Sequence, residues 1–562
     1  MMGWIRRERR LPRRSRGQRG QAVVLIAFSI TFVISLLGLS VDSVRLYILY
    51  NQAQRAAEAG ALAGVLYMPD FFSPLAPAID GNSAVSRACA ETAKNGVPCA
   101  TGPGLVGAWP SQVPGKPNDL LVTVTLAADN FLLALLNPSL ASSTVVATST
   151  AEYLPPVQLG SRLTYFGDQT RGDQFYAAVD GPQDLKEYGD ALTPIMEEGD
   201  SDPIANPDAS SFIYTTSYGK STNHQQTAGW PQPNPNQQPP GFNGTDGAPG
   251  YSYEIDVPAA SLNVAVQVYN PRYDPGGGSS LWTDDHFQGW ENVFPGCSDS
   301  TKWLSTLGAC HFEEANLYMT MGYSLYKVPL PFERSKDVLV ASQTYTPVDN
   351  WGPDLTDKGC SPGSEVFDVT TGACAAISSY PDIGAWTTIG TITQAGMYRL
   401  TVDAGTIGYG SKQYSVRLVP TMNDPGLRLF AWNDMSVIFT VGGTDQVFDL
   451  GNIPAPYAGK TLDFSVYDPG DSGGTVCLRI LDPSGNTAAL PAWVHTTAAC
   501  GANWIDASRS YYNGLTLNLP IAIPKVYSGG WWQVEYKTTA SDIDDKVTIA
   551  ISLKGNPLHL VG

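Results

Sequence analysis

The first strong pattern in the chain is an uncharged apolar run near its N-terminus. Residues Ala22 to Leu39 read AVVLIAFSITFVISLLGL, and extension to Val41 gives 20 apolar or weakly polar residues. At a rise of about 1.5 Å per residue, a helix of this length matches the bilayer core, about 30 Å thick. The pattern predicts a transmembrane helix. Its expected anchor positions are Ala22, Leu25, Phe28, Phe32, Leu36 and Leu39.

A cleaved secretory signal is the competing interpretation of this run. Such a signal has a shorter apolar region, with a small-residue cleavage site close behind it. Here the run leads directly into Asp42, Ser43 and Arg45, and alanine-rich helical spacing continues without a proline to residue 68. Because no cleavage site follows the run, we expect a retained anchor. Because alanine is the best helix former, we expect one helix over residues 21–66. The alanines of its outer half offer a smooth face for neighbouring helices.

The next segment, residues 67–160, predicts a small membrane-proximal unit. Residues 83–95 have helical spacing, whereas residues 120–127 and 144–153 alternate as strands do. Asp129 is expected to cap a short helix over residues 130–136. Pro155 and Pro156 then mark a linker.

The remainder of the chain carries a duplicated strand pattern. Residues 253–258 and 262–269 resemble residues 448–454 and 462–467, and each second strand ends in a Tyr-Asx-Pro turn. A glycine-aromatic strand follows in each copy, at residues 396–402 and 530–536, and then a last strand, at 414–418 and 547–553. Counting between matched positions gives the first copy an insertion of about 64 residues.

These patterns predict an α+β chain: a long N-terminal transmembrane helix, a small α/β head and two mainly-β sandwich domains. The helix and head resemble those of pilin-like proteins, and the sandwiches resemble jelly rolls. The expected boundaries are 1–20 for a basic tip, 21–66 for the helix, 67–160 for the head, 161–427 for the first sandwich with its insertion and 428–562 for the second. Residues 229–250, rich in Pro, Asn, Gln and Gly, are expected to form an exposed loop.

Charge is unevenly distributed along the chain. Residues 1–20 contain eight arginines and one glutamate, and without them the formal net charge of the chain falls from −18 to −25. Arginines before an apolar span favour a cytoplasmic N-terminus and an extracytoplasmic body, so membrane lipid is the first expected partner. A body this acidic is unsuited to phosphate backbones, and no nucleic-acid partner is expected.

The segment around the anchor resembles the N-terminal domain of TadG-like proteins of the tight-adherence (Flp) pilus system. The matching positions are Gly20, Gln21, Ala22, Val41, Asp42, Arg45, Leu46, Tyr47, Gln54, Ala56, Ala57 and Ala61 to Gly64. The resemblance covers about 50 residues and implies contacts with other pilus-assembly proteins through the alanine-rich helix. Leu25 stands where related pseudopilins have a glutamate, and the von Willebrand A motif of many members is absent. Whether a prepilin peptidase cleaves after Gly20 stays open.

The sequence motif that most resembles a catalytic site is interpreted as a turn. Gly470 to Gly474 (GDSGG) resembles the nucleophile loop of serine proteases, but His495 follows Ser472 instead of preceding it. The first copy has a similar glycine-rich turn at 274–280. Five histidines form no His-Glu-x-x-His pair. The sequence therefore predicts no catalytic residue, no metal site of a known motif and no cofactor, although calcium at an acidic site stays open.

Eight cysteines lie beyond the anchor, where an exported compartment would oxidise them. Their spacing favours pairs of sequence neighbours. The expected disulfides are Cys89–Cys99, Cys297–Cys310, Cys360–Cys374 and Cys477–Cys500.

Two functions fit the sequence. The first is a membrane-anchored, non-enzymatic protein of the pilus-assembly class, acting in adhesion or assembly through a surface glycan or protein ligand. The alternative is an anchored extracellular hydrolase or carbohydrate-binding protein, in which a carboxylate pair assembles in three dimensions without a local motif.

Overall fold

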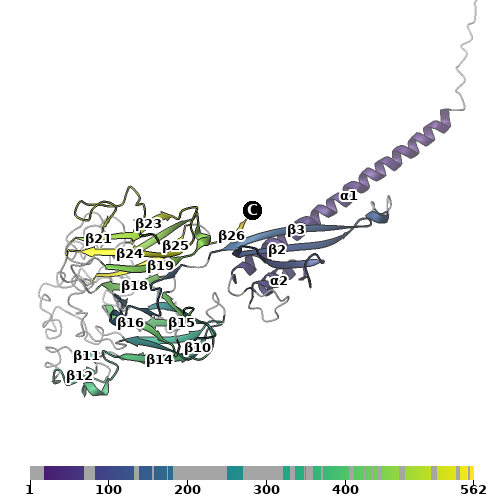
Figure 1. Ribbon diagram of the computed structural model, residues 1–562. Coiled ribbons are helices and arrows are strands. Elements are labelled where there is room, and N and C mark those ends of the chain that lie inside the picture. The colour runs from purple at the N-terminus through teal and green to yellow at the C-terminus, as the bar shows by residue number, and fades with distance from the viewer. Residues whose placement is uncertain are drawn as a thin grey trace, which may run out of the picture. The chain divides into compact units, whose positions relative to one another are not determined.

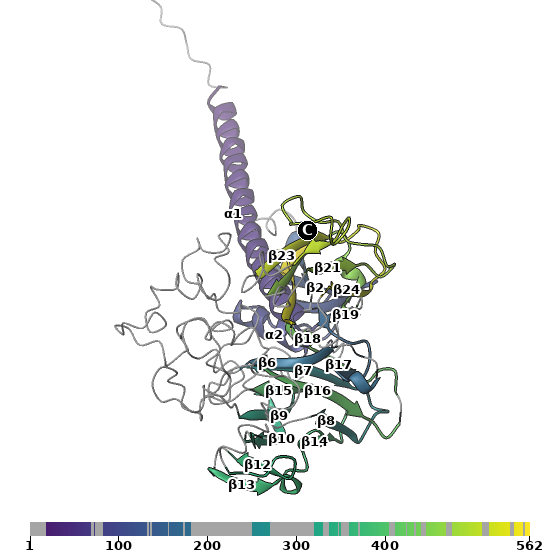
Figure 2. The same ribbon diagram turned by 90° about the vertical axis from the view of Figure 1, so that its left-hand side faces the viewer.

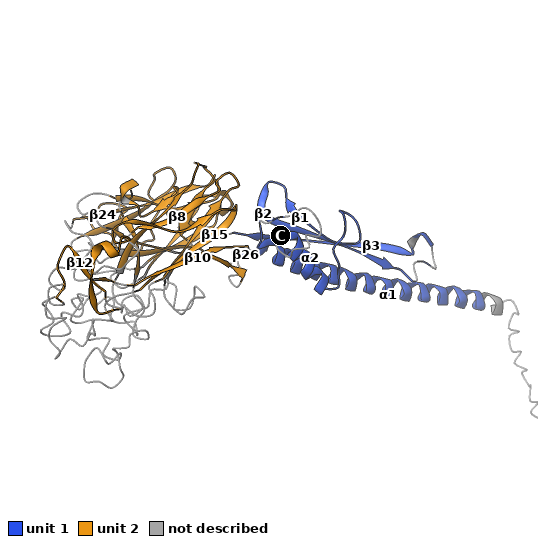
Figure 3. Cartoon of the chain, turned by 90° about the horizontal axis from the view of Figure 1, so that it is seen from below, with its two compact units in different colours: residues 1–154, 557–562 blue, residues 155–556 orange. Residues whose placement is uncertain are grey.

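The computed structural model divides the chain into two compact units, residues 1–154 with 557–562 and residues 155–556 (Figure 3). The structure describes residues 18–68, 83–131, 138–154, 157–180, 250–269, 320–329, 336–349, 359–403, 411–439, 446–467, 475–507, 516–539, 545–554 and 557–561, together with residues 72 and 134. Within these ranges, residues 172, 174, 347, 369, 370, 423, 432 and 433 are not described.

The first unit is a long helix packed with a second helix against a four-stranded sheet (Figure 1). The sheet is antiparallel, with the strand order β1-β2-β3-β26. Its elements are α1 (Gln18–Val65), α2 (Ala84–Lys94), β1 (Gly107–Val113), β2 (Lys116–Asp129), β3 (Ser142–Tyr153) and β26 (Leu558–Val561). The predicted helix 83–95 and the predicted strands 120–127 and 144–153 are confirmed. The short helix predicted over 130–136, which Asp129 is expected to cap, falls largely outside the described residues; Asp129 is the last residue of β2.

The alanine-rich half of α1 is buried in the chain's own head. Ala53, Ala56, Ala57 and Ala61 are completely buried, and α1 packs on α2, β2 and β3. Small side chains let the helix approach these elements closely, as they do at other tight helix contacts. These four alanines are therefore covered by the chain's own head. Contacts of α1 with other pilus-assembly proteins stay a prediction.

Gly64 lies at the tightest point of this packing. A Cβ added there would lie 2.5 Å from the carbonyl oxygen of Ala84 and 2.5 Å from Cδ2 of Leu120. Although alanine favours helix formation, Gly64→Ala is expected to destabilise the head by about 1–3 kcal/mol through overpacking. Hydrogen exchange of α2 in the detergent-solubilised chain should become faster. Arg55→Ala, at an exposed position of the same helix, should leave it unchanged; equal exchange in both variants would contradict the packing argument.

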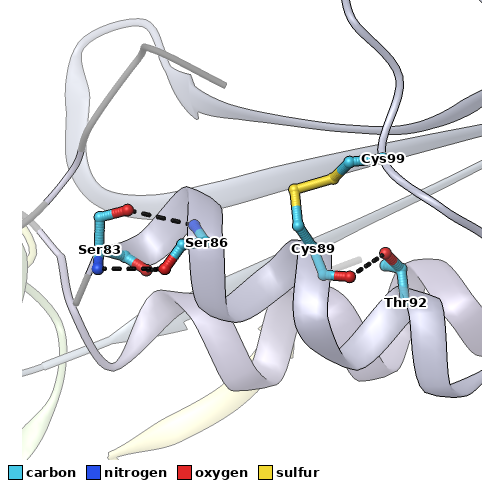
Figure 4. Close-up of a disulfide and its surroundings, with 5 residues drawn as sticks. All are labelled: Ser83, Ser86, Cys89, Thr92 and Cys99. Atoms are coloured by element: carbon cyan, nitrogen blue, oxygen red, sulfur yellow. Dashed lines mark hydrogen bonds between the residues drawn. A yellow bond between two sulfur atoms is a disulfide. The ribbon is translucent and has the colours of Figure 1, made fainter. Parts of the chain in front are cut away.

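Helix α2 begins at a capping box. The Ser83 hydroxyl accepts a hydrogen bond from the Ser86 amide, and the Ser86 hydroxyl accepts one from the Ser83 amide (Figure 4). This arrangement satisfies two amides that a helix N-terminus otherwise leaves unpaired. Further along the helix, Cys89 forms a disulfide with Cys99, which fixes α2 to the segment that leads into β1.

The fourth strand of the head comes from the far end of the chain. In β26, Leu558 pairs with Tyr153 and Val561 with Thr150, while the His559 and Glu152 side chains approach to 3.2 Å. The predicted boundary of the second sandwich at residue 562 is wrong, because residues 557–562 complete the head's sheet. The larger unit is thus joined to the head by two segments of chain, one at each of its ends.

The second unit consists mainly of two extended antiparallel sheets. The first has the order β10-β9-β15-β7-β17-β4-β19-β24-β21-β22, and the second the order β14-β8-β16-β6-β18-β25-β20-β23, with β5 (Tyr165–Phe166) paired to β16. A separate small sheet contains β11 (Val348–Asp349), β12 (Glu365–Asp368) and β13 (Ala373–Ala376).

Among the described residues, nine strands of the first half of this unit recur in the second half. The first half has β4 (Gln158–Leu159), β6 (Phe175–Asp180), β7 (Gly250–Val257), β8 (Val264–Tyr269), β9 (Met321–Lys327), β10 (Val338–Tyr345), β14 (Trp386–Ile392), β15 (Gly396–Asp403) and β16 (Ser411–Val419). The second half has β17 (Arg428–Ala431), β18 (Asp434–Phe439), β19 (Gln446–Ile453), β20 (Thr461–Tyr467), β21 (Val476–Leu481), β22 (Ile505–Asp506), β23 (Thr516–Ala522), β24 (Gly530–Thr538) and β25 (Asp545–Leu553). Matched in this order, they occupy equivalent places in the sheets, and the predicted duplication is confirmed.

The halves are not separate domains, because they exchange their first strands. Strand β17 of the second half pairs with β7 of the first, and β4 of the first half pairs with β19 of the second. The other sheet is continuous through the pair β6–β18 (Figure 2). The predicted division at residue 428 is therefore wrong, since both sheets run through it.

Aromatic side chains fill the space between the two sheets. The Tyr253 and Tyr414 hydroxyls are 2.8 Å apart in the first half, and in the second the Phe439 and Tyr536 rings stack at 4.2 Å. Phe175 and Phe448 meet across the two halves, at 5.6 Å between ring centroids. Burial of these large rings supplies much of the hydrophobic stabilisation of the unit.

Candidate functional site

The apolar side chains in the N-terminal part of α1 are exposed. In Figure 1 this part of the helix extends beyond the sheet of the head. The predicted anchor residue Phe28 is 73% exposed, and Ala22, Leu25, Phe32, Leu36 and Leu39 are exposed as well. Among the described residues, one helix is long and apolar enough to cross a membrane, from Ala22 to Val65. Bare apolar surface on this scale is typical of a membrane anchor or a signal sequence.

The first polar residues after the apolar run hold the end of the β2–β3 hairpin. Buried Asp42 accepts a hydrogen bond from the Phe131 amide at 3.2 Å. Arg45 donates to the Asp129 carbonyl at 2.8 Å, and its guanidinium lies 4.6 Å from the centre of the Phe131 ring. Asp42 and Arg45 are among the positions that carry the TadG-like resemblance. Here they connect α1, at the end of its apolar run, to the hairpin of the head.

Three of the four predicted disulfides are present in the described residues. They are Cys89–Cys99, Cys360–Cys374 and Cys477–Cys500. The predicted pair Cys297–Cys310 lies outside the described residues. Cys477 and Cys500 form a buried cluster with Trp504, and the guanidinium of Arg479 lies 4.4 Å from the centre of that indole ring.

A polar pocket lies where the two halves of the second unit join. Its volume is about 260 Å³, and its polar lining residues are Ser161, Arg162, Asp173, Asp449 and Gln533. Arg162 binds both carboxylate oxygens of Asp449, at 2.6 and 2.8 Å, and Gln533 donates to the same carboxylate at 3.2 Å. The bidentate pair gives the pocket a rigid wall.

This junction pocket escaped the sequence analysis, because its residues come from three distant parts of the chain and form no local motif. Arg171, two residues before Asp173, ends a single 3-10 turn and lies over the Tyr165 ring.

The Asp173 carboxyl has an altered pKa. Burial raises it from the usual 3.8 to about 6; hydrogen bonds from the Asp168 and Gly167 amides oppose the rise, and the nearby Asp168 and Asp449 carboxylates add to it. The fold therefore favours the protonated form. The corresponding stability is fully present below about pH 4 and is lost as the pH rises through about 6.

Replacement of Asp173 by Asn should remove this pH dependence. The raised pKa corresponds to about 3 kcal/mol, so Asp173→Asn should match the natural chain near pH 4 and exceed its stability by up to about 3 kcal/mol near pH 8. Thermal unfolding followed by near-UV circular dichroism measures the difference. Asp424→Asn, at a half-exposed turn, controls for the loss of one negative charge. A variant no more stable than the natural chain near pH 8 would contradict the assignment.

The residues that resemble a serine-protease arrangement are described only in part. His495 Nδ1 lies 3.5 Å from Asp506 Oδ2, whereas Gly470 to Gly474, including Ser472, fall outside the described residues. The described residues contain no cluster of three His, Cys, Asp or Glu side chains that could hold a metal ion.

The chain matches no protein-family model, and no curated protein matches it.

Proposed function

We propose that this chain is a single-pass membrane protein of the tight-adherence pilus-assembly class, with a cytoplasmic N-terminus and an extracytoplasmic body that acts in adhesion or assembly without catalysis. The observation that carries the proposal is that the two halves of α1 have different surroundings. Its first half presents apolar side chains to the surroundings, and its second half is the buried centre of the head.

Continuity of α1 supports a retained anchor over a cleaved signal. Asp42 and Arg45 contact the hairpin directly after the apolar run, so removal of the helix near residue 41 would cut immediately beside these contacts. The eight arginines before the span support the orientation. Disulfides in both units suit an oxidising compartment outside the cytoplasm.

Extraction of membranes tests the anchor. The full chain should stay in the pellet at alkaline pH, while a Phe28→Arg and Phe32→Arg double variant should be released, because each arginine at the centre of a span costs about 2.5–3.5 kcal/mol. Val44→Arg is a matched control: Val44 is exposed on the same helix but lies beyond the predicted span. Release of the natural chain, or retention of the double variant, would refute the anchor.

The strand order supports a binding role for the body. Each half places eight strands in two facing sheets, in the orders β6-β16-β8-β14 and β7-β15-β9-β10 for the first half. We infer that each half is a jelly roll, an architecture that also occurs in lectins. Adhesion through a glycan or protein ligand fits this layout.

A second candidate function, carbohydrate binding by the body, is favoured by the junction pocket. Carboxylate, amide and guanidinium groups line it, and the Arg162 guanidinium lies 5.8 Å from the centre of the Trp531 ring. Such groups can bind sugar hydroxyls, and an aromatic ring can stack on a sugar face. Binding of the soluble body to an array of bacterial polysaccharides tests this function. Gln533→Ala, which changes the lining of the pocket, should reduce any specific signal, and an unchanged signal would exclude the pocket.

A further inference from the structure

Phe131 is an exposed apolar residue that is held beside Asp42 and Arg45 of α1. Its amide donates to Asp42, one residue after the end of the apolar run, and its ring lies under the Arg45 guanidinium. The ring is nevertheless 65% exposed. Two contacts thus fix the position of the residue while its side chain stays open to the surroundings.

The neighbouring part of α1 has the features of a membrane–water boundary. Val41 and Val44 are exposed apolar residues, and Tyr47 and Tyr50 are exposed aromatic residues one to two turns further on. Tyrosines are enriched at the level of lipid headgroups, and an arginine beside the span can reach lipid phosphates while its stem lies along apolar surface. In the sequence, Phe131 is followed by Leu-Leu-Ala-Leu-Leu, so the apolar character continues beyond it.

We propose that the end of the β2–β3 hairpin at Phe131 is a second lipid-binding element, which inserts its side chain into the outer boundary of the bilayer beside α1. The proposal rests on the anchor proposed above. Its occupant is lipid, because the Asp42 and Arg45 contacts hold the exposed ring beside the end of the apolar span. The hairpin would then hold the head at a defined height and limit its rocking about the helix.

Site-specific photo-crosslinking tests this contact. The full-length chain is reconstituted in vesicles of palmitoyl-oleoyl phosphatidylcholine with p-benzoylphenylalanine in place of Phe131, Phe28 or Gln112. Gln112 is an exposed residue that pairs with Leu120, about 30 Å along β2 from Asp129 at the usual strand rise. After illumination, mass spectrometry measures lipid adducts on each variant.

The expected result is strong labelling at positions 28 and 131, at least about tenfold above that at position 112. Labelling at 28 without labelling at 131 would overturn the hairpin contact and leave the anchor intact. Equal labelling at 131 and 112 would also overturn it, because the whole head would then lie on the membrane. Absence of labelling at 28 would refute the anchor itself.

Discussion

Separate expression of residues 155–427 and 428–556 is expected to give two chains that do not fold alone. Each half would lose a strand that the other supplies, since β17 pairs with β7 and β4 pairs with β19. Each half would also expose the edge of β6 or β18, which pair with each other in the intact unit. The ring contact between Phe175 and Phe448 would be lost. Exposed apolar edges of this kind promote aggregation.

The control for this experiment is the uncut unit, residues 155–556, which should be monomeric and unfold cooperatively. Co-expression of the halves should restore a one-to-one complex on size-exclusion chromatography. If an isolated half proved monomeric, with cooperative thermal unfolding, the strand exchange would not be essential. The division into two domains at residue 428 would then be correct.

Loss of the Cys477–Cys500 disulfide is expected to lower the free energy of unfolding of the second unit by about 3 kcal/mol, from the entropy of the loop it closes. The cysteines are separated by 23 positions and lie in the buried cluster with Trp504. The double variant Cys477→Ala, Cys500→Ala should therefore unfold at a lower denaturant concentration, measured by tryptophan fluorescence.

A matched control is the double variant Cys360→Ala, Cys374→Ala. This disulfide has a separation of 14 positions, but it lies at the small sheet β11–β13, where Cys374 is exposed. Its loss should loosen that sheet and leave the main transition almost unchanged. Equal midpoints for the Cys477–Cys500 variant and the natural chain would show that the loop is held by other contacts.

Local signals in the sequence were sufficient for the helices, many strands and the disulfides. The apolar run and the alanine spacing predicted residues 21–66, and α1 covers Gln18–Val65. The repeated Tyr-Asx-Pro turns revealed the duplication, because equivalent strands keep equivalent ends. Neighbouring cysteines paired as their spacing suggested, wherever the structure describes them.

Long-range pairing was beyond the sequence. Strand β26 pairs with β3, about four hundred positions away. It has only four residues, too few for an alternating pattern to predict a strand. The exchange of β4 and β17 depends on a two-residue and a four-residue strand. The junction pocket likewise joins Arg162 to Asp449, which are 287 positions apart. These contacts are set by topology, which a single sequence does not encode in local patterns.

The orientation of the chain is tested most directly by protease treatment of intact cells that express it with an N-terminal epitope tag. Protease should remove the body, residues 67–562, and leave the tag attached to a small membrane-bound fragment that is degraded only after the cells are permeabilised. Loss of the tag from intact cells, or protection of the body until permeabilisation, would contradict an anchored protein whose body lies outside the cytoplasm.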